Sequence, residues 1–199
     1  MVWSPSARFR YLLFYKPYGI LTQFTDPDGR PTLKTFIPVP DVYPVGRLDV
    51  DSEGLLMLTD DGELAHCLID PRYAHPRTYI VQVEGLPDEK ALDNLRKGVL
   101  IQGRCSLPAG VERLNEEPPL PPRPVPIRFR KSIPTAWLRL TIREGRNRQV
   151  RKMTASVGHP TLRLIRVGIG PLRLEGMAPG EWREMTPVEK QALKQDLKG

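Results

Sequence analysis

Hydrophobic and polar residues follow one another along several short stretches in patterns typical of strands. Two stretches are almost continuously apolar, as expected of a strand that is buried on both faces. Two others alternate with a period of two; in one of them Tyr79, Val81 and Val83 share a face. The stretches predicted as strands are residues 9–15, 55–59, 78–84, 136–143 and 161–167.

Helices are predicted where apolar residues recur every three or four positions behind a residue that can cap a helix. Asp60-Asp61-Gly62 supplies cap oxygens for a helix over residues 63–69, and Thr186-Pro187-Val188-Glu189 has the form of a capping box with proline at the first helical position. The remaining predicted helices cover residues 87–97 and 147–157, and the helix behind the capping box extends to residue 197.

Six prolines lie between residues 116 and 126. Because proline can continue neither a helix nor a strand ladder, this segment is predicted to be an extended surface connection. We interpret this connection as the seam between two halves of one domain. Because strands outnumber helices and hairpins outnumber crossovers, the expected fold class is α+β, with a largely antiparallel mixed β-sheet and flanking helices.

Charge changes this picture by making the two halves unlike. Residues 1–99 carry 11 Lys and Arg against 14 Asp and Glu, a balance of −3, whereas residues 100–199 carry 19 against 9, a balance of +10. The basic second half favours a polyanionic partner such as RNA. A basic surface that is merely solvated would give the same balance, so charge alone does not assign a function.

Cysteine, histidine and hydropathy exclude several classes of protein. Cys67 and Cys105 match neither a disulfide framework nor a zinc-ligand spacing, and we predict that both are buried. The three histidines lie far apart, so the sequence predicts no metal site. No run approaches the roughly 20 apolar residues that span a bilayer, and the first residues lack a secretion signal, so we expect a cytoplasmic protein without a membrane partner.

Acidic residues at 49, 51, 53 and 60 are open to several interpretations. Their spacing resembles a calcium-binding EF-hand loop with Gly54 at its sixth position. Three prolines, however, crowd the stretch where an EF-hand needs its entering helix, and residues 55–59 within the loop resemble a strand. Two carboxylates acting on a glycosidic bond are a second interpretation. Capping of a turn is a third, and it is the one that we favour for Asp51.

Three ordered blocks are more specific. They are residues 46–62 (GRLDVDSEGLLMLTDDG), 77–81 (RTYIV) and 144–153 (EGRNRQVRKM), the last followed by residues 158–160 (GHP) and 162–166 (LRLIR). Together they resemble, in the same order, the motifs of the RsuA-like family of bacterial ribosomal RNA pseudouridine synthases. The resemblance extends from about residue 11 to residue 174. Arg77 departs from the pattern, because many relatives have Lys there.

The resemblance implies roles for individual residues. Asp49 stands where the family has its catalytic aspartate, Tyr79 where it has the active-site tyrosine, and Arg151 where it has the ion-pair partner that keeps the aspartate charged. Asp49 could act as a nucleophile on the sugar or the base, or remove a sugar proton; both roles stay open. The implied substrate and RNA contacts are Arg47, Arg77, Arg146, Arg148, Lys152 and Leu164, the last as an apolar wall of the pocket.

The same resemblance implies two lobes around a central catalytic cleft and the isomerisation of a flipped uridine in 23S rRNA, near the peptidyl transferase region. The reaction involves no net redox change, so no cofactor is expected. We expect a monomeric catalytic domain over residues 1–199, without a separate N-terminal RNA-binding module, that acts on a hairpin or on the assembling large subunit. The alternatives are an inactive basic rRNA-binding or assembly factor and a glycosidase that releases free uracil.

Overall fold

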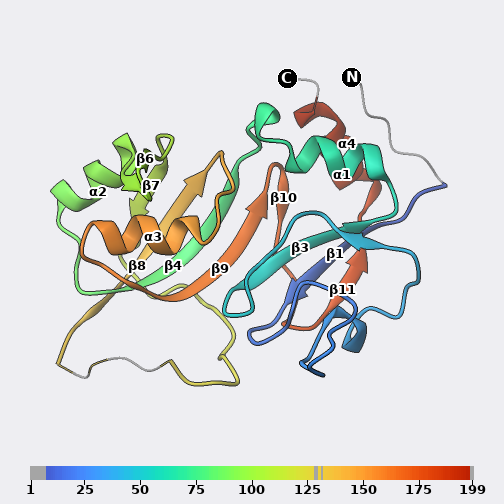
Figure 1. Cartoon of the computed structure of the whole chain (residues 1–199), viewed down its shortest axis with the longest axis horizontal. Coiled ribbons are helices and arrows are strands. Elements are labelled where there is room, and N and C mark those ends of the chain that lie inside the picture. The colour runs from blue at the N-terminus through green and yellow to red at the C-terminus, as the bar shows by residue number, and fades with distance from the viewer. Residues whose placement is uncertain (1–7, 128–129, 131, 198–199) are drawn as a thin grey trace. The chain divides into compact units, whose positions relative to one another are not determined.

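The computed structural model describes residues 8–127, 130 and 132–197, which divide into two compact units (Figure 1). Unit 1 contains the chain up to His75 and again from Val167 onward, and unit 2 contains Pro76–Arg166. Strand β9 (Thr161–Ile169) begins in unit 2 and ends in unit 1. The proline-rich segment 116–126 therefore lies within unit 2, away from the boundaries between the units.

Strand β1 (Tyr11–Lys16) lies between two antiparallel neighbours in unit 1. It pairs with β3 (Glu53–Thr59) in a register that runs from Tyr11↔Thr59 to Lys16↔Gly54, and on its other side with β11 (Trp182–Glu184). Every residue of β1 and β3 is buried, which explains why their sequences are mostly apolar and do not alternate. Two short strands complete the pairing in unit 1: β2 (Tyr43–Pro44) beside β3 and β10 (Leu172–Arg173) beside the end of β9.

The core of unit 1 forms on both faces of these strands. On one face, Leu12, Phe14, Leu56 and Leu58 cluster with Leu33, Ile37 and Val42; Leu33 begins the 3₁₀-helix η1 (Leu33–Thr35). The side chain of Tyr11 on β1 contacts residues of the helices α1 (Gly62–Ile69) and α4 (Pro187–Asp196), including the N-cap of α1. Its hydroxyl donates to the Asp61 carboxylate over 2.8 Å, and the Lys190 ammonium lies 5.1 Å from the centre of its ring. A second 3₁₀-helix, η2 (Pro71–Tyr73), follows α1.

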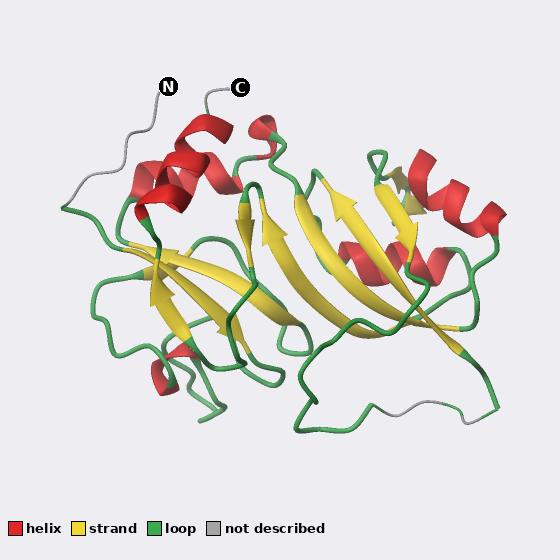
Figure 2. Ribbon diagram, turned by 180° about the vertical axis from the view of Figure 1, so that it is seen from behind, coloured by secondary structure: helices red, strands yellow, loops and turns green. Residues whose placement is uncertain are grey.

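Unit 2 is built around β4 (Arg77–Glu84), which pairs antiparallel with β8 (Thr135–Ile142) along its whole length. The strand order is β9, β4, β8, β7 (Gly110–Arg113). Helices α2 (Glu89–Lys97) and α3 (Gln149–Ser156) belong to this unit, as does a hairpin of two two-residue strands, β5 (Leu100–Ile101) and β6 (Arg104–Cys105) (Figure 2). In β4, Tyr79, Val81 and Val83 are buried, as their alternation predicts.

All five predicted strands and all four predicted helices are present, and the α+β class is confirmed. The helix predicted from residue 87 begins at Glu89, because Asp88 is its N-cap and accepts from the Ala91 amide. The prediction that both cysteines are buried is wrong for Cys105, which is exposed on β6. Within the described part of the chain, no helix combines the length and hydropathy needed to cross a bilayer.

Candidate functional site

The residues expected to act on the substrate are divided between the two units. Arg47 and Asp49 belong to the loop between β2 and β3 in unit 1. Tyr79, Arg151 and the other expected contact residues belong to unit 2. The local environment of each group follows from contacts within its own unit.

Hydrogen bonds fix the backbone of the Asp49 loop on both sides of the aspartate. Before it, the Thr22 hydroxyl donates to the Leu48 carbonyl over 2.6 Å and accepts from the Leu48 amide over 3.3 Å. After it, the Val50 carbonyl accepts from the Gly19 amide over 2.8 Å. The Asp49 carbonyl itself accepts from the Ser52 amide, which closes a tight turn. The half-buried Asp49 side chain is thus carried on a backbone with little freedom.

Lys16 stabilises a turn that contacts the same loop. This last residue of β1 is fully buried, and its ammonium donates to the carbonyls of Pro17 and Ile20 over 2.9 and 2.8 Å. The 17–20 turn that it stabilises includes Gly19, whose φ of 83° is in the left-handed region and whose amide binds the Asp49 loop. The sequence predicts only a turn after β1, and nothing local to Lys16 indicates this anchoring role.

The acidic positions around Asp49 differ from one another in their surroundings. Glu53 is buried as the first residue of β3, and Asp60 follows that strand and accepts from the Arg10 amide over 2.7 Å. A strand therefore occupies the place where an EF-hand would have the second half of its loop. Among the described residues, no group of three or more His, Cys, Asp or Glu side chains is arranged to hold a metal ion.

Tyr79 lies in a buried environment in unit 2, opposite Leu140 of β8. Its hydroxyl oxygen accepts a hydrogen bond from the Arg166 guanidinium of β9, whose side chain is also buried. Burial lowers the pKa of Arg166; the nearby Tyr79 acts in the opposite direction, whereas the charge of Arg77 adds to the lowering. Because a guanidinium can only donate, the Tyr79 oxygen is the acceptor.

The second and third sequence blocks are brought together in unit 2. One terminal nitrogen of Arg77, Nη1, lies 3.5 Å from the place that a side chain at Gly145 would occupy, so the start of β4 adjoins the turn before α3. Arg151 on α3 is half-buried, and its Nη1 donates to the Thr161 carbonyl at the start of β9 over 3.4 Å. Leu164, further along β9, is buried.

The expected RNA-contacting cations divide into two kinds. Arg148, the N-cap of α3, is exposed and has a left-handed φ of 51°. Arg146 and Lys152 instead donate to the β5–β6 hairpin, Arg146 to the Ile101 carbonyl over 2.6 Å and Lys152 to the Gln102 side chain over 2.9 Å. The sequence did not separate these kinds, because the hairpin lies more than 40 residues away and its strands are only two residues long.

The chemistry available from these residues is proton transfer or nucleophilic attack. Unit 1 carries a carboxylate on a fixed loop. Unit 2 carries a phenol that accepts from a guanidinium, and a cationic turn before α3. A carboxylate can attack an electrophilic carbon or take a proton, and a phenol can give or take one.

Comparison with known proteins shows similarity to a family model, to two relatives and to a solved structure. The family model described as RNA pseudouridylate synthase matches residues 10–156. The chain is 53% identical over 180 residues to ribosomal large subunit pseudouridine synthase E of Vibrio vulnificus, covering 90% of this chain and 76% of the relative. It is 57% identical over 174 residues to the protein of that name in Xanthomonas campestris, covering 86% and 93%. A crystal structure of a pseudouridylate synthase superposes with a TM-score of 0.77 at 30% identity, covering 93% of this chain and 74% of that one.

Proposed function

Because this chain belongs to the RNA pseudouridylate synthase family, and so is an RNA-modifying isomerase, we propose that it converts one uridine of 23S rRNA to pseudouridine. The observation that carries the choice of RNA is the similarity to several relatives named large subunit pseudouridine synthase E, at 53–58% identity over 84–90% of this chain. Ribosomal RNA is made and assembled in the bacterial cytoplasm, so the proposed substrate places the reaction there. One copy of the chain suffices for the proposed chemistry.

The reaction breaks the bond between C1′ of the ribose and N1 of the base and forms a bond from C1′ to C5. The proton lost from C5 is balanced by the proton gained at N1, so the product is an isomer of the substrate. No electrons are transferred to or from an external acceptor. The residues of the chain therefore need to supply a group that acts at the sugar or base, a proton acceptor for C5, and a cationic surface for the RNA.

We assign the first role to Asp49 and the second to Tyr79. Both chemical roles for Asp49, as a nucleophile or as a base that removes a sugar proton, need the ionised carboxylate, and the Arg151 guanidinium is the proposed ion-pair partner. The fixed backbone around Asp49 supports this assignment, because a catalytic carboxylate gains rate from a defined position. The Arg166 hydrogen bond supports the assignment of Tyr79, because it orients the phenol.

Binding requires that the target uridine leave its stack, since the anomeric carbon of a stacked nucleotide is inaccessible to side chains. We assign to Arg47, which is exposed and lies two residues before Asp49, the role of bracing the RNA after the base has turned out. Tyr79 would stack on the flipped base, with Leu164 as an apolar wall and Arg77 beside it. Arg148 contributes charge that neutralises phosphates, which makes binding dependent on salt.

Mapping of pseudouridines tests the proposed function. Ribosomal RNA from cells with and without the gene is treated with carbodiimide and read by primer extension, and purified protein is then added to the RNA that lacks the modification. We expect one 23S stop to disappear on deletion and to return with the protein. An unchanged map would contradict the proposal, whereas loss of the stop without restoration in vitro would favour an assembly factor. Release of free uracil would identify a glycosidase.

A further inference from the structure

The β5–β6 hairpin is held to the third sequence block by side chains from that block. The Arg146 guanidinium donates to the carbonyls of Ile101, Arg104 and Cys105, at distances from 2.6 to 3.4 Å. The Lys152 ammonium donates to the Gln102 side chain over 2.9 Å and to the Asn147 carbonyl over 2.7 Å. The hairpin, the turn before α3 and α3 itself are thereby linked.

The hairpin is also closed at its base. The Ser106 amide donates to the Val99 carbonyl over 2.8 Å, and the Ser106 hydroxyl accepts from the Val99 amide over 3.0 Å. Gly98 has a φ of 97°, and a Cβ there would lie 2.4 Å from the Ser106 carbonyl oxygen, so the two strands leave no room for a side chain at this point. Two-residue strands are not stable alone, and these contacts replace the missing ladder.

The tip of the hairpin has a defined shape. Gln102 and Gly103 both have positive φ, at 50° and 78°, as in the two-residue turns that match the twist of a hairpin. Arg104 follows immediately and is exposed, as are Gln102 and Gly103. The hairpin therefore presents a cationic side chain on a turn whose backbone is already ordered.

The charges around the hairpin favour an anionic partner. Arg104 on the hairpin and Arg148 on the adjoining turn are exposed. The carboxylate of that turn, Glu144, is engaged internally: it accepts from the Leu107 amide over 2.8 Å and from the Gln149 side-chain amide. Its negative charge thus serves to join the turn to the segment after the hairpin.

We propose that the β5–β6 hairpin and the adjoining turn form a preordered contact surface for the RNA phosphate backbone, an inference that rests on the proposed function. Arg104 and Arg148 contact phosphates directly. Arg146 and Lys152 act as struts that hold the hairpin in place, which revises their expected role as direct contacts. Preordering reduces the conformational entropy that the chain loses when the RNA binds.

The two cysteines permit a footprint on the unaltered protein. Cys105 is exposed on the hairpin, whereas Cys67 is buried in α1 and reports whether the fold is intact. We expect saturating 23S rRNA to slow alkylation of Cys105 by N-ethylmaleimide severalfold, read by mass spectrometry of the peptides, while Cys67 stays unreactive. A rate at Cys105 that RNA leaves unchanged would overturn the proposal. If the wild-type chain formed no pseudouridine, the proposed function would fail first, independently of this footprint.

Substitutions separate direct contacts from struts. Arg104→Met should reduce the slope of log K against log salt by about 0.7–0.9, as expected for one phosphate contact, and leave the hairpin ordered. Arg146→Met and Arg146→Lys should behave alike, because a lysine keeps the charge but cannot serve the same set of carbonyls. Both substitutions at Arg146 should raise the rate of amide exchange of residues 102–105. When either is combined with Arg104→Met, the affinity for RNA should fall little below that of Arg104→Met alone.

Two outcomes would overturn the strut assignment. The first is an Arg146→Lys protein that binds RNA with the wild-type affinity and salt slope, as a direct phosphate contact would allow. The second is unchanged hydrogen exchange of the hairpin in Arg146→Met. Arg139→Met is the matched control, because Arg139 is an exposed arginine of unit 2 that pairs with Glu112 on β7. It should change neither the Cys105 footprint nor hairpin exchange, and alkylation of Cys67 would reveal unfolding in any variant.

Discussion

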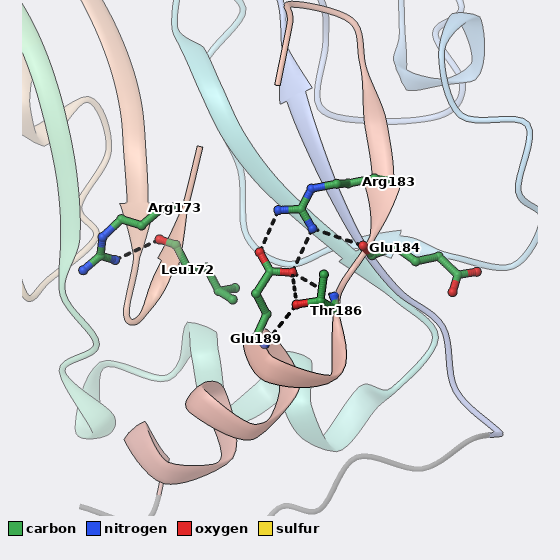
Figure 3. A network of polar contacts seen from close by, with 6 residues as sticks. All are labelled: Leu172, Arg173, Arg183, Glu184, Thr186 and Glu189. Atoms are coloured by element: carbon green, nitrogen blue, oxygen red, sulfur yellow. Dashed lines mark hydrogen bonds and ion pairs between the residues drawn. The ribbon is translucent and has the colours of Figure 1, made fainter. Parts of the chain in front are cut away.

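Replacement of Glu189 by Gln tests how the C-terminal helix is attached (Figure 3). The Glu189 carboxylate receives two hydrogen bonds from the Arg183 guanidinium, over 2.8 and 2.7 Å, and two from Thr186, from its amide over 2.8 Å and its hydroxyl over 3.0 Å. The Thr186 hydroxyl in turn accepts from the Glu189 amide, which completes the predicted capping box. The substitution keeps the size of the side chain and removes its charge.

The size of the effect follows from the pKa of Glu189. Arg183, and to a lesser degree Thr186, hold this pKa at about 2, against an ordinary value of 4.5. The fall of the pKa from 4.5 to about 2 corresponds to at most about 3.4 kcal/mol of folding free energy. The Arg183 side chain is 32% exposed, so solvent screens the ion pair. We therefore expect the pair to contribute about 1–2 kcal/mol to the free energy of unfolding at pH 7. This contribution is complete above about pH 4.5 and is lost as the pH falls through about 2.

Urea unfolding at pH 7 and at pH 3, followed by circular dichroism and by amide exchange of α4, measures the contribution. Glu189→Gln should lower the free energy of unfolding at pH 7, and the difference from wild type should shrink at pH 3. Glu184→Gln is the control, because the Glu184 carboxylate points away from this network and only its carbonyl accepts from Arg183. A difference between wild type and Glu189→Gln that stays constant from pH 7 to pH 3 would refute the electrostatic reasoning.

Two further substitutions test the supports of the site and of the hairpin. Thr22→Val keeps the shape of the side chain but removes both hydrogen bonds to Leu48. Because Asp49 would then be misplaced, kcat should fall about tenfold or more in single-turnover kinetics. The affinity for RNA, measured by filter binding, should change little. Gly98→Ala forces a Cβ against the Ser106 carbonyl at a backbone position with positive φ. It should abolish the protection of the hairpin amides in hydrogen exchange and weaken RNA binding. Unchanged protection of these amides would contradict the close approach between Gly98 and Ser106.

The regular elements could be predicted because their local patterns agree with their final burial. The run at residues 55–59 is apolar since β3 is buried on both faces, and the capping box at Thr186 forms from residues that are close in sequence. Hairpin β5–β6 was missed because its stability depends on Arg146, which is distant along the chain. The same omission explains the wrong prediction for Cys105. Its hydrophobic character predicts burial, whereas its position on a short strand leaves it exposed.

Site residues were predictable to the extent that short motifs carry them. Asp49 and Tyr79 were singled out by blocks that resemble a family, and their catalytic roles remain predictions. The role of Arg166 is not predictable, because nothing in a strand with two arginines, Arg163 and Arg166, indicates which hydroxyl either of them will meet. Lys16 was read as part of a turn, since nothing local indicates that its ammonium is buried against two carbonyls.

One comparison of variants tests most directly whether Asp49 is the catalytic residue. Asp49→Asn and Asp51→Asn are each incubated under single-turnover conditions with 23S rRNA from cells that lack the gene, and pseudouridine is read by carbodiimide-dependent primer extension. We predict that Asp49→Asn binds the RNA with near wild-type affinity but forms pseudouridine on the order of 10³-fold more slowly or not at all, while Asp51→Asn stays within about tenfold of wild type. Retention of most activity by Asp49→Asn would contradict the central claim.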